Sequence, residues 1–395
     1  MTHEPSRPTW VDVNLEALRW NVAQARRLVP PSTKLLAQVK SDAYGHGLIP
    51  VAQIFTACGA DFLGVASLDE ARALRAAGVT TPILAQTALA PEEASEVIAC
   101  DVRPTVCTLE FARALDRTAK ARGHRMPVHL KVDTGMGRLG LWHEDVPTFL
   151  DEVAACEALV WEGCYTHLPS ADDDPVFTRR ELQIFARLIE GLRARGWSFP
   201  LVHAANSMGV IAYRESHYHM ARPGLMLYGL YPLESLRHDL PLAPALSWKS
   251  RIIFLKSVPA GRSISYGRTH VTKRASTIAT IPVGYGDGYR RCLSNRAEVL
   301  VRGQRAPVVG RVCMDHLMLD VGAIPNVSVG DEVALIGEQH GAQITAEEVA
   351  RWAETIPYEI VTAITDRVPR RYVQQPVNVS TTLIRQPAQS LPQPA

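Results

Sequence analysis

Short apolar runs alternate with longer stretches of helical character between residues 30 and 230. The helical stretches, at 68–77, 91–99, 109–122 and 176–195, repeat Ala, Leu, Glu and Arg at the spacing of one helix face. Strand-length runs that alternate with helices indicate repeated βα units and therefore a parallel sheet. The apolar runs lie at 35–40, 62–66, 82–86, 102–106, 127–132, 159–166, 200–204 and 224–230.

The number of these runs distinguishes between two parallel architectures. Eight runs favour a closed (β/α)8 barrel of the TIM type over an open, doubly wound sheet. No G-x-G-x-x-G motif follows the first run, which counts against a dinucleotide-binding fold. We therefore predict an α/β protein whose N-terminal domain, residues 10–243, is a (β/α)8 barrel.

The pattern changes after residue 240, where the apolar segments become short and rich in Val and Ile. Turns such as Ala260-Gly261 separate several of them, which is typical of antiparallel strands. One helical stretch is expected near 345–355. The segments lie at 246–258, 276–283, 297–301, 306–312, 316–321 and 332–336.

These segments predict a second, smaller and mostly antiparallel β domain over residues 244–373. The sequence L-P-L-A-P-A-L at 240–246 is the expected junction with the barrel. Residues 374–395 are rich in Gln and Pro with few charges, so we expect a disordered tail.

The composition narrows the class of protein. With 47% hydrophobic and 21% charged residues, the 395-residue chain has the composition of a soluble enzyme. A net charge of +2 without a basic run gives no reason to expect nucleic acid, and no apolar stretch is long enough for a membrane span. The start has no apolar segment of the secretory type, and the seven cysteines include no C-x-x-C, so we expect reduced thiols and a cytoplasmic location. His217 and His219 come nearest to metal spacing, and we expect no metal there.

Lys40 is the first candidate for chemistry. It lies in V-K-S-D-A-Y-G-H-G, residues 39–47, directly behind the apolar residues 35–37. This order places one amine at the carboxyl end of a strand, which is the catalytic face of a parallel barrel. A partly desolvated lysine has a lowered pKa and becomes a usable nucleophile or base. A surface lysine after an edge strand would give the same local pattern.

Polar groups follow other expected strands of the barrel. K-V-D-T-G-M-G-R-L-G at 131–140 brings Arg138 into a Gly-rich loop, where its guanidinium can hold a carboxylate or stand as an ordinary surface group. Thr166-His167 ends another strand. Ser207, in the loop Ala204–Gly209, and the backbone after Gly224 could form an anion nest or two ordinary loops.

The second domain adds tyrosines in turns. They lie in Ser265-Tyr266-Gly267, in G-Y-G-D-G-Y at 284–289 and in Pro357-Tyr358-Glu359, while C-M-D occupies 313–315. A tyrosine in such a turn usually packs, so each motif alone is a weak indication. Their order along the chain carries more weight.

Eight motifs occur in one order: VKSDAYGHG, KVDTGMGRLG, HAANSMG, ARPGLMLYG, AGRSISYGRT, PVGYGDGY, GRVCMD and PYEIVT…RVPRRY. On these motifs the chain resembles bacterial alanine racemases from about residue 10 to residue 373. The resemblance implies a pyridoxal-phosphate enzyme with a barrel followed by a β domain, as the hydrophobic pattern independently indicates. It also implies a homodimer with shared active sites and alanine as the small-molecule substrate.

The resemblance assigns roles to individual positions. It implies that Lys40 binds the cofactor covalently and acts as the base on one face of the substrate, and that Tyr266 of the second subunit acts on the other face. His167 would link Tyr266 to Arg222, the residue facing the pyridine nitrogen. The remaining cofactor-binding positions are Tyr44, Asn206, Ser207, Gly224, Leu225 and Tyr358.

For the substrate, the resemblance implies that Arg138 and the backbone amide of Met314 hold the carboxylate. Tyr285 and Met314 would narrow the access route and favour a methyl side chain. Lys131 matches a position that is carbamylated in some members, where the added carboxylate would orient Arg138. An arginine at position 222 would leave the ring nitrogen unprotonated and the ring a weaker electron sink, which suits racemisation and suppresses transamination.

Some departures from the family pattern leave specificity open. Asp42 stands where Asn is commoner, His316 where Gln is common, and Pro169 is a less usual residue. A racemase of broader range, acting on serine or basic amino acids, is therefore the main alternative. A non-catalytic cofactor carrier would lack the second domain, and a decarboxylase of this barrel class would place a carboxylate at the position of Arg222. The sequence leaves open whether the enzyme supplies cell-wall D-alanine or degrades it.

Overall fold

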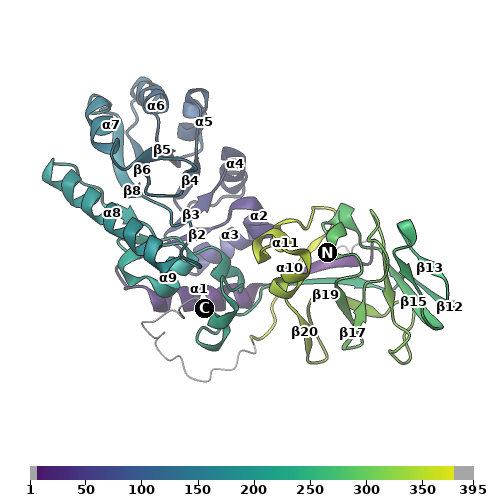
Figure 1. Ribbon diagram of the computed structural model, residues 1–395. Helices are drawn as coiled ribbons and strands as arrows, with labels where there is room; N and C mark the ends of the chain where they lie inside the picture. The colour runs from purple at the N-terminus through teal and green to yellow at the C-terminus, as the bar shows by residue number, and fades with distance from the viewer. Residues whose placement is uncertain (1–6, 378–395) are drawn as a thin grey trace.

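A computed structural model of the protein describes residues 7–377 and consists of two lobes (Figure 1). The first lobe is a barrel of eight parallel strands in the order β10-β2-β3-β4-β5-β6-β8-β9. Backbone bonds from His219 N to Val202 O (3.0 Å) and from Arg222 N to Ala205 O (2.9 Å) join the last strand to the first. The strands are β2 (Lys34–Gln38), β3 (Phe62–Val65), β4 (Ile83–Ala88), β5 (Val102–Val106), β6 (Met126–Asp133), β8 (Leu159–Tyr165), β9 (Leu201–His203) and β10 (Met220–Ala221).

Helices cover the outside of this barrel, and their first turns carry the expected capping side chains. Ser67, Thr108 and Asp174 each accept a hydrogen bond from a backbone N–H of the helix that follows. The helices are α1 (Leu15–Leu28), α2 (Lys40–Gly45), α3 (Leu48–Ala57), α4 (Leu68–Ala76), α5 (Ala94–Ala99), α6 (Leu109–Ala121), α7 (Val146–Glu152), α8 (Pro175–Ala194) and α9 (Ser207–Ala212). None of the helices within residues 7–377 combines the length and apolar character that crossing a membrane requires.

The main core lies between the barrel strands and these helices and continues into the second lobe, and a smaller cluster is separate from it. In β2, Leu35 and Ala37 belong to the main core while Leu36 belongs to the small cluster, as the alternation of a strand requires. The small cluster, formed by Leu36, Phe62, Leu84, Leu201 and Met220 from five barrel strands, therefore fills the barrel interior.

The second lobe confirms the mostly antiparallel β domain. Its largest sheet has the order β17-β16-β19-β11-β1-β21, with β20 paired to β19, and β12-β15-β18 form a three-stranded sheet. The strands are β11 (Leu246–Arg251), β12 (Phe254–Val258), β13 (Ser263–Ile264), β14 (His270–Val271), β15 (Ser276–Ile281), β16 (Glu298–Val301), β17 (Gln304–Pro307), β18 (Leu317–Asp320), β19 (Glu332–Gln339), β20 (Ala342–Ile344) and β21 (Arg370–Val373), with helices α10 (Ala346–Ala353) and α11 (Pro357–Thr362).

The beginning of the chain corrects one sequence-based expectation. Strand β1 (Thr9–Asn14) was expected in the barrel domain, but it lies in the sheet of the second lobe, antiparallel to β11 and parallel to β21. Its local pattern of a strand followed by α1 is the same as that of a barrel unit. Only the partners, which come from the far end of the sequence, determine which sheet it joins.

The expected strand at 224–230 is also wrong. The eighth strand is β10, which ends at Ala221, and Leu225–Tyr228 forms a 3-10 turn, η3. The run is apolar because the turn is buried, and hydrophobicity alone does not separate a buried turn from a buried strand. The run 246–258 is likewise two strands that belong to different sheets. Of the expected disordered tail, residues 378–395 lie outside the described residues.

Candidate active site

Lys40 begins α2, two residues after the end of β2, at the mouth of the barrel. The four residues that follow it, Ser41–Tyr44, have φ between 51° and 55° and ψ between 38° and 55°, which is a left-handed helical turn. Each non-glycine residue in this conformation costs about 1–2 kcal/mol. Such a turn persists only where its surroundings fix it, and it determines the direction in which Lys40 leaves the strand.

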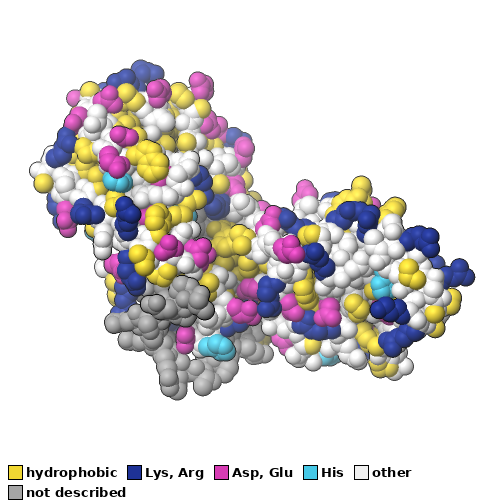
Figure 2. Space-filling view, in the orientation of Figure 1, with side chains coloured by type: hydrophobic (Ala, Val, Ile, Leu, Met, Phe, Trp, Pro, Cys, Tyr) yellow, Lys and Arg dark blue, Asp and Glu magenta, His cyan; other side chains and the backbone are white. Residues whose placement is uncertain are grey.

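Side chains and backbone groups hold this turn. Glu70 accepts a hydrogen bond from Ser41 N (2.5 Å), and Asp42 Oδ1 accepts one from Leu48 N (2.7 Å). The second lobe contributes Arg370, which donates from Nε to Gly45 O (3.1 Å). Helix α11 lies beside α2 at the junction of the lobes, where Figure 2 shows hydrophobic side chains on the drawn face. Both lobes therefore position Lys40.

Four basic side chains influence one histidine at the barrel mouth. Burial and the charges of Arg222, Lys131, Arg138 and Lys40, in that order, hold the pKa of His167 well below its ordinary value. Burial and then the charge of Arg138 also lower the pKa of Lys40, against a smaller opposing effect of Glu70. These mutual effects indicate that Lys40, Lys131, Arg138, His167 and Arg222 gather at the barrel mouth. The site has an excess of positive charge and suits an anionic ligand.

Lys131 is buried in β6, where its Nζ donates to Val132 O at 2.8 Å. Burial, followed by the charge of Arg222, lowers the pKa of Lys131 to about 7. A substantial fraction of this amine is therefore neutral and nucleophilic near neutral pH.

The loop after β6 carries Arg138 on its exposed side. The carboxylate of Asp133 accepts hydrogen bonds from the backbone N–H groups of Gly135 (2.9 Å), Met136 (2.8 Å) and Gly137 (2.8 Å). These bonds satisfy the carboxylate of Asp133 with hydrogen-bond donors from the loop itself. They fix the backbone next to Arg138, whose side chain is exposed.

Arg222 is buried and heads a chain of hydrogen bonds that the sequence did not suggest. It donates to His203 Nδ1 (2.9 Å); His203 Nε2 contacts His129 Nδ1 (2.9 Å), and His129 Nε2 contacts Glu162 (3.1 Å). Since a guanidinium only donates, His203 must accept at Nδ1 and carry its proton on Nε2, and the same direction follows for His129. Burial, as the largest cause, holds the pKa of both histidines below the ordinary value and lowers that of Arg222 to about 10. Arg222 thus remains a cation, and two neutral rings separate it from the carboxylate of Glu162.

A cup of polar groups lies beside Arg222. Ser207 Oγ accepts from Gly224 N (2.9 Å) and Met226 N (3.3 Å), which leaves its own O–H available as a donor. A Cβ at Gly224 would lie 2.5 Å from the hydroxyl of Tyr44, so only glycine allows this approach. The rings of Tyr44 and Tyr358 are 5.9 Å apart. Burial raises the pKa of both phenols, so both remain O–H donors at neutral pH.

Two other expected cofactor residues support this cup. Asn206 caps α9 by accepting from Gly209 N (2.9 Å), and its amide donates to Leu168 O (3.2 Å). Its side chain therefore ties the loop before Ser207 to the loop after β8. Leu225 is the first residue of η3, directly after Gly224.

The remaining expected site residues lie elsewhere, on the surface of the second lobe. Tyr266 is 70% exposed, Met314 54% and Tyr285 42%. Backbone bonds from Tyr285 N to Cys313 O (3.0 Å) and from Gly286 N to Met314 O (2.9 Å) join two of their loops. Within residues 7–377, no hydrogen bond, ion pair or aromatic contact joins Tyr266, Tyr285 or Met314 to Lys40, Arg138 or Arg222.

The sequence of this chain matches the models of a known protein family. Residues 13–232 match the family model of the alanine racemase N-terminal domain, and residues 245–372 match that of the alanine racemase C-terminal domain. The chain belongs to the alanine racemase family.

Individual relatives agree along nearly their whole length. The chain is 44% identical to the alanine racemase of Halothermothrix orenii over 94% of this chain and 98% of that one. It is 46% identical to the alanine racemase of Symbiobacterium thermophilum over 93% and 97%. Among solved structures, the alanine racemase of Bacillus anthracis with bound L-Ala-P has a TM-score of 0.88 and 37% identity, with 94% of this chain and 96% of that chain covered.

Proposed function

We propose that this protein is a pyridoxal-phosphate-dependent racemase that interconverts L-alanine and D-alanine. The observations that carry the proposal are the partly exposed lysine that begins α2 at the barrel mouth, the basic side chains of Arg138 and Arg222 near it, and the donor hydroxyl of Ser207. Such a site attracts both the phosphate of a cofactor and the carboxylate of an amino acid. The names of the relatives, and the ligand L-Ala-P in one of their structures, give the substrate.

The residues present fit pyridoxal phosphate. Tyr44, Tyr358, the hydroxyl of Ser207 and the backbone N–H of Leu225 are donors that would hold its phosphate, and Gly224, whose N–H binds Ser207, would position that hydroxyl. The amine of Lys40, with its lowered pKa, would bind its aldehyde. The bound cofactor would withdraw electrons from the substrate and so acidify the hydrogen on Cα.

Arg222 favours racemisation over the competing reactions of this cofactor. Its pKa of about 10 and its position at the head of the histidine chain keep it a cation that only donates. Facing the ring nitrogen of the cofactor, such a donor would keep that nitrogen unprotonated and the ring a weaker electron sink. Return of the proton to Cα would then be favoured over transamination.

Inverting Cα requires a proton donor and acceptor on each face of the substrate. Lys40 serves one face, and Tyr266 of the partner subunit serves the other, in a homodimer whose two sites are shared. Support comes from the exposure of Tyr266, Tyr285 and Met314 on the second lobe. His167 would mediate between Tyr266 of the partner subunit and Arg222.

The carboxylate of the substrate would be bound by Arg138 and by the backbone amide of Met314 of the partner subunit. Tyr285 of the partner subunit would limit the size of the side chain. The neutral fraction of Lys131 suits reaction with carbon dioxide, and the resulting carbamate would orient Arg138.

All seven cysteines are free thiols, which agrees with a cytoplasmic location.

The deciding experiment supplies pyridoxal phosphate to the purified protein and offers L-alanine, L-serine, L-lysine and L-arginine separately. Chiral chromatography then measures the D-amino acids formed. Formation of D-alanine well above the other products supports the proposal. Similar rates with several amino acids would identify a racemase of broad range, and no racemisation despite bound cofactor would contradict the proposed function.

A further inference from the structure

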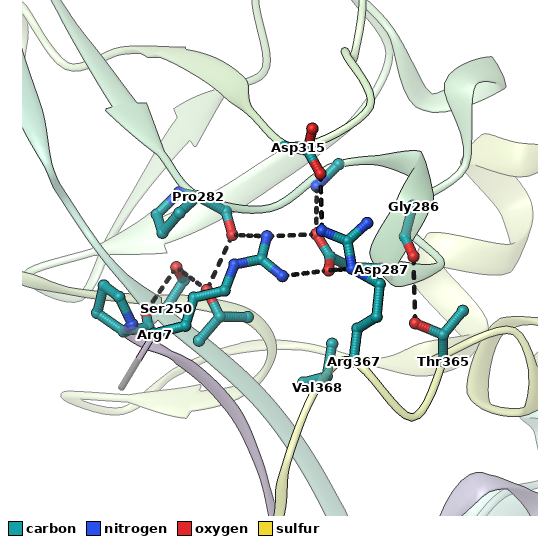
Figure 3. A network of polar contacts seen from close by, with 12 residues as sticks. Arg7, Ser250, Pro282, Gly286, Asp287, Asp315, Thr365, Arg367 and Val368 are labelled. Atoms are coloured by element: carbon teal, nitrogen blue, oxygen red, sulfur yellow. Dashed lines mark hydrogen bonds and ion pairs between the residues drawn. The ribbon is translucent and has the colours of Figure 1, made fainter. Parts of the chain in front are cut away.

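Asp287 is a fully buried carboxylate in the loop that carries Tyr285 (Figure 3). Arg7 donates to both of its oxygens, from Nη1 at 2.5 Å and from Nη2 at 2.8 Å, and Gly284 N donates to Oδ2 at 3.0 Å. Arg367 approaches from the opposite side, with its Nε 3.6 Å from Oδ1. A buried carboxylate bound by two arginines in this way has one strongly preferred position.

Arg367 connects this carboxylate to the loop of Met314. Its Nη2 donates to Asp315 Oδ1 at 2.7 Å, one residue after Met314. A Cβ at Gly286 would lie 2.3 Å from Nη1 of Arg367, so the guanidinium packs directly on the backbone next to Tyr285. Together with the backbone bonds between the two loops, Arg367 makes them one unit.

Arg7 connects the same unit to the start of the chain. Its Nη2 also donates to Pro282 O (2.6 Å), and its own carbonyl accepts from Thr9 N (2.8 Å) at the first residue of β1. Asp287 is 280 residues away in sequence. Arg7 therefore fixes the position of loop 284–287 relative to the largest sheet of the second lobe, which includes β1.

We infer that Arg7 and Arg367 are positioning residues that set how narrowly Tyr285 and Met314 limit the size of the substrate. Neither arginine contacts Lys40 or Arg222, so their effect is on selectivity and KM and not on the chemical step. The inference rests on the proposed function, because it assigns Tyr285 and Met314 to the active site of a racemase.

The test compares Arg7→Ala, Arg7→Lys and Arg367→Ala with Arg296→Ala as a matched control. Arg296 belongs to the same lobe and makes an exposed ion pair with Glu354 at 2.7 Å. We expect kcat/KM for L-alanine divided by kcat/KM for L-serine to fall about ten-fold in Arg7→Ala and in Arg367→Ala. The reason is that less firmly positioned Tyr285 and Met314 would no longer distinguish two side chains that differ by one substituent. KM for L-alanine should rise while kcat stays within about two-fold, Arg7→Lys should recover part of the selectivity, and the control should resemble the wild type.

Hydrogen exchange by mass spectrometry gives a readout that is independent of activity. In the two alanine variants, the peptides that cover Gly284–Tyr289 and Cys313–His316 should exchange faster, with barrel peptides unchanged. The side chain of Arg367 is partly exposed, so Arg367→Ala is the variant expected to fold normally. Unchanged selectivity in this variant would overturn the inference. Faster exchange throughout the protein would overturn it as well. If the wild type racemises nothing, the proposed function fails; unchanged local exchange would show separately that the arginines do not position these loops.

Discussion

The two halves of the proposed site differ in how they are built. In the barrel, Lys131, Ser207 and Arg222 are buried and hydrogen-bonded, and burial lowers the pKa of Lys131 and of Arg222. On the second lobe, Tyr266 and Met314 are mostly exposed. Burial therefore sets the protonation of Lys131 and Arg222 on the barrel side. Groups that complete and limit the site lie on a surface, where only another surface can cover them.

The largest effect is expected in the barrel half. Lys40→Ala should reduce turnover by more than about 10⁴-fold, because it removes both the attachment point of the cofactor and one base. The absorbance band of lysine-bound cofactor should disappear at the same time. Lys34→Ala is the matched control, since Lys34 is an exposed lysine at the start of the same strand. Retained racemisation in Lys40→Ala would refute the role of this lysine.

Tyr266→Phe tests the exposed half on one face of the substrate. The equilibrium constant of racemisation is one, so kcat/KM must fall equally in both directions, and the individual proton transfers have to be measured by exchange. In D₂O, the α-hydrogen of L-alanine should exchange about 10²–10⁴-fold more slowly than in the wild type, while that of D-alanine still exchanges through Lys40. Nuclear magnetic resonance follows both reactions. Equal losses for the two enantiomers would exclude a base that acts on one face.

Lys131 tests whether burial in the barrel prepares a group for modification. Because its pKa is about 7, the neutral amine that reacts with carbon dioxide predominates above that pH. A carbamate resonance should therefore appear in ¹³C-bicarbonate as the pH rises through 7 and disappear below it. Lys131→Met should raise KM for alanine about ten-fold, the effect of one lost charge-assisted hydrogen bond to Arg138. Absence of the resonance at pH 8 would contradict the modification.

The smallest change tests whether the halves belong to different subunits. Lys40→Ala and Tyr266→Phe, each nearly inactive alone, should regain about a quarter of wild-type activity when mixed under conditions that exchange subunits. Random pairing of the two variants makes half of the dimers mixed. In each mixed dimer, one of the two sites combines an intact Lys40 with an intact Tyr266. Native mass spectrometry verifies the exchange. Demonstrated exchange without recovered activity would argue against shared sites.

Local sequence patterns predicted much of the barrel half, because strand and helix periods repeat there and the ends of parallel strands meet on one face. They did not reveal His129 and His203. Each is visible as a polar residue inside an apolar run, but their contact depends on the order β6-β8-β9, which brings residues 74 positions apart together. The contact of Arg7 with Asp287 was missed for the same reason. Long-range pairing of polar groups leaves no period in the sequence.

The place of β1 has a consequence for the synthesis of the chain. This strand is made long before its partner β21, and Asp12 binds Arg371 across 359 residues. At about 5–20 residues per second, β1 waits roughly 20–70 seconds for this neighbour. The barrel between them can fold during translation, whereas the sheet that supports the turn of Lys40 closes only after residues 370–373 have been made. A finished active site therefore forms after the barrel and not together with it.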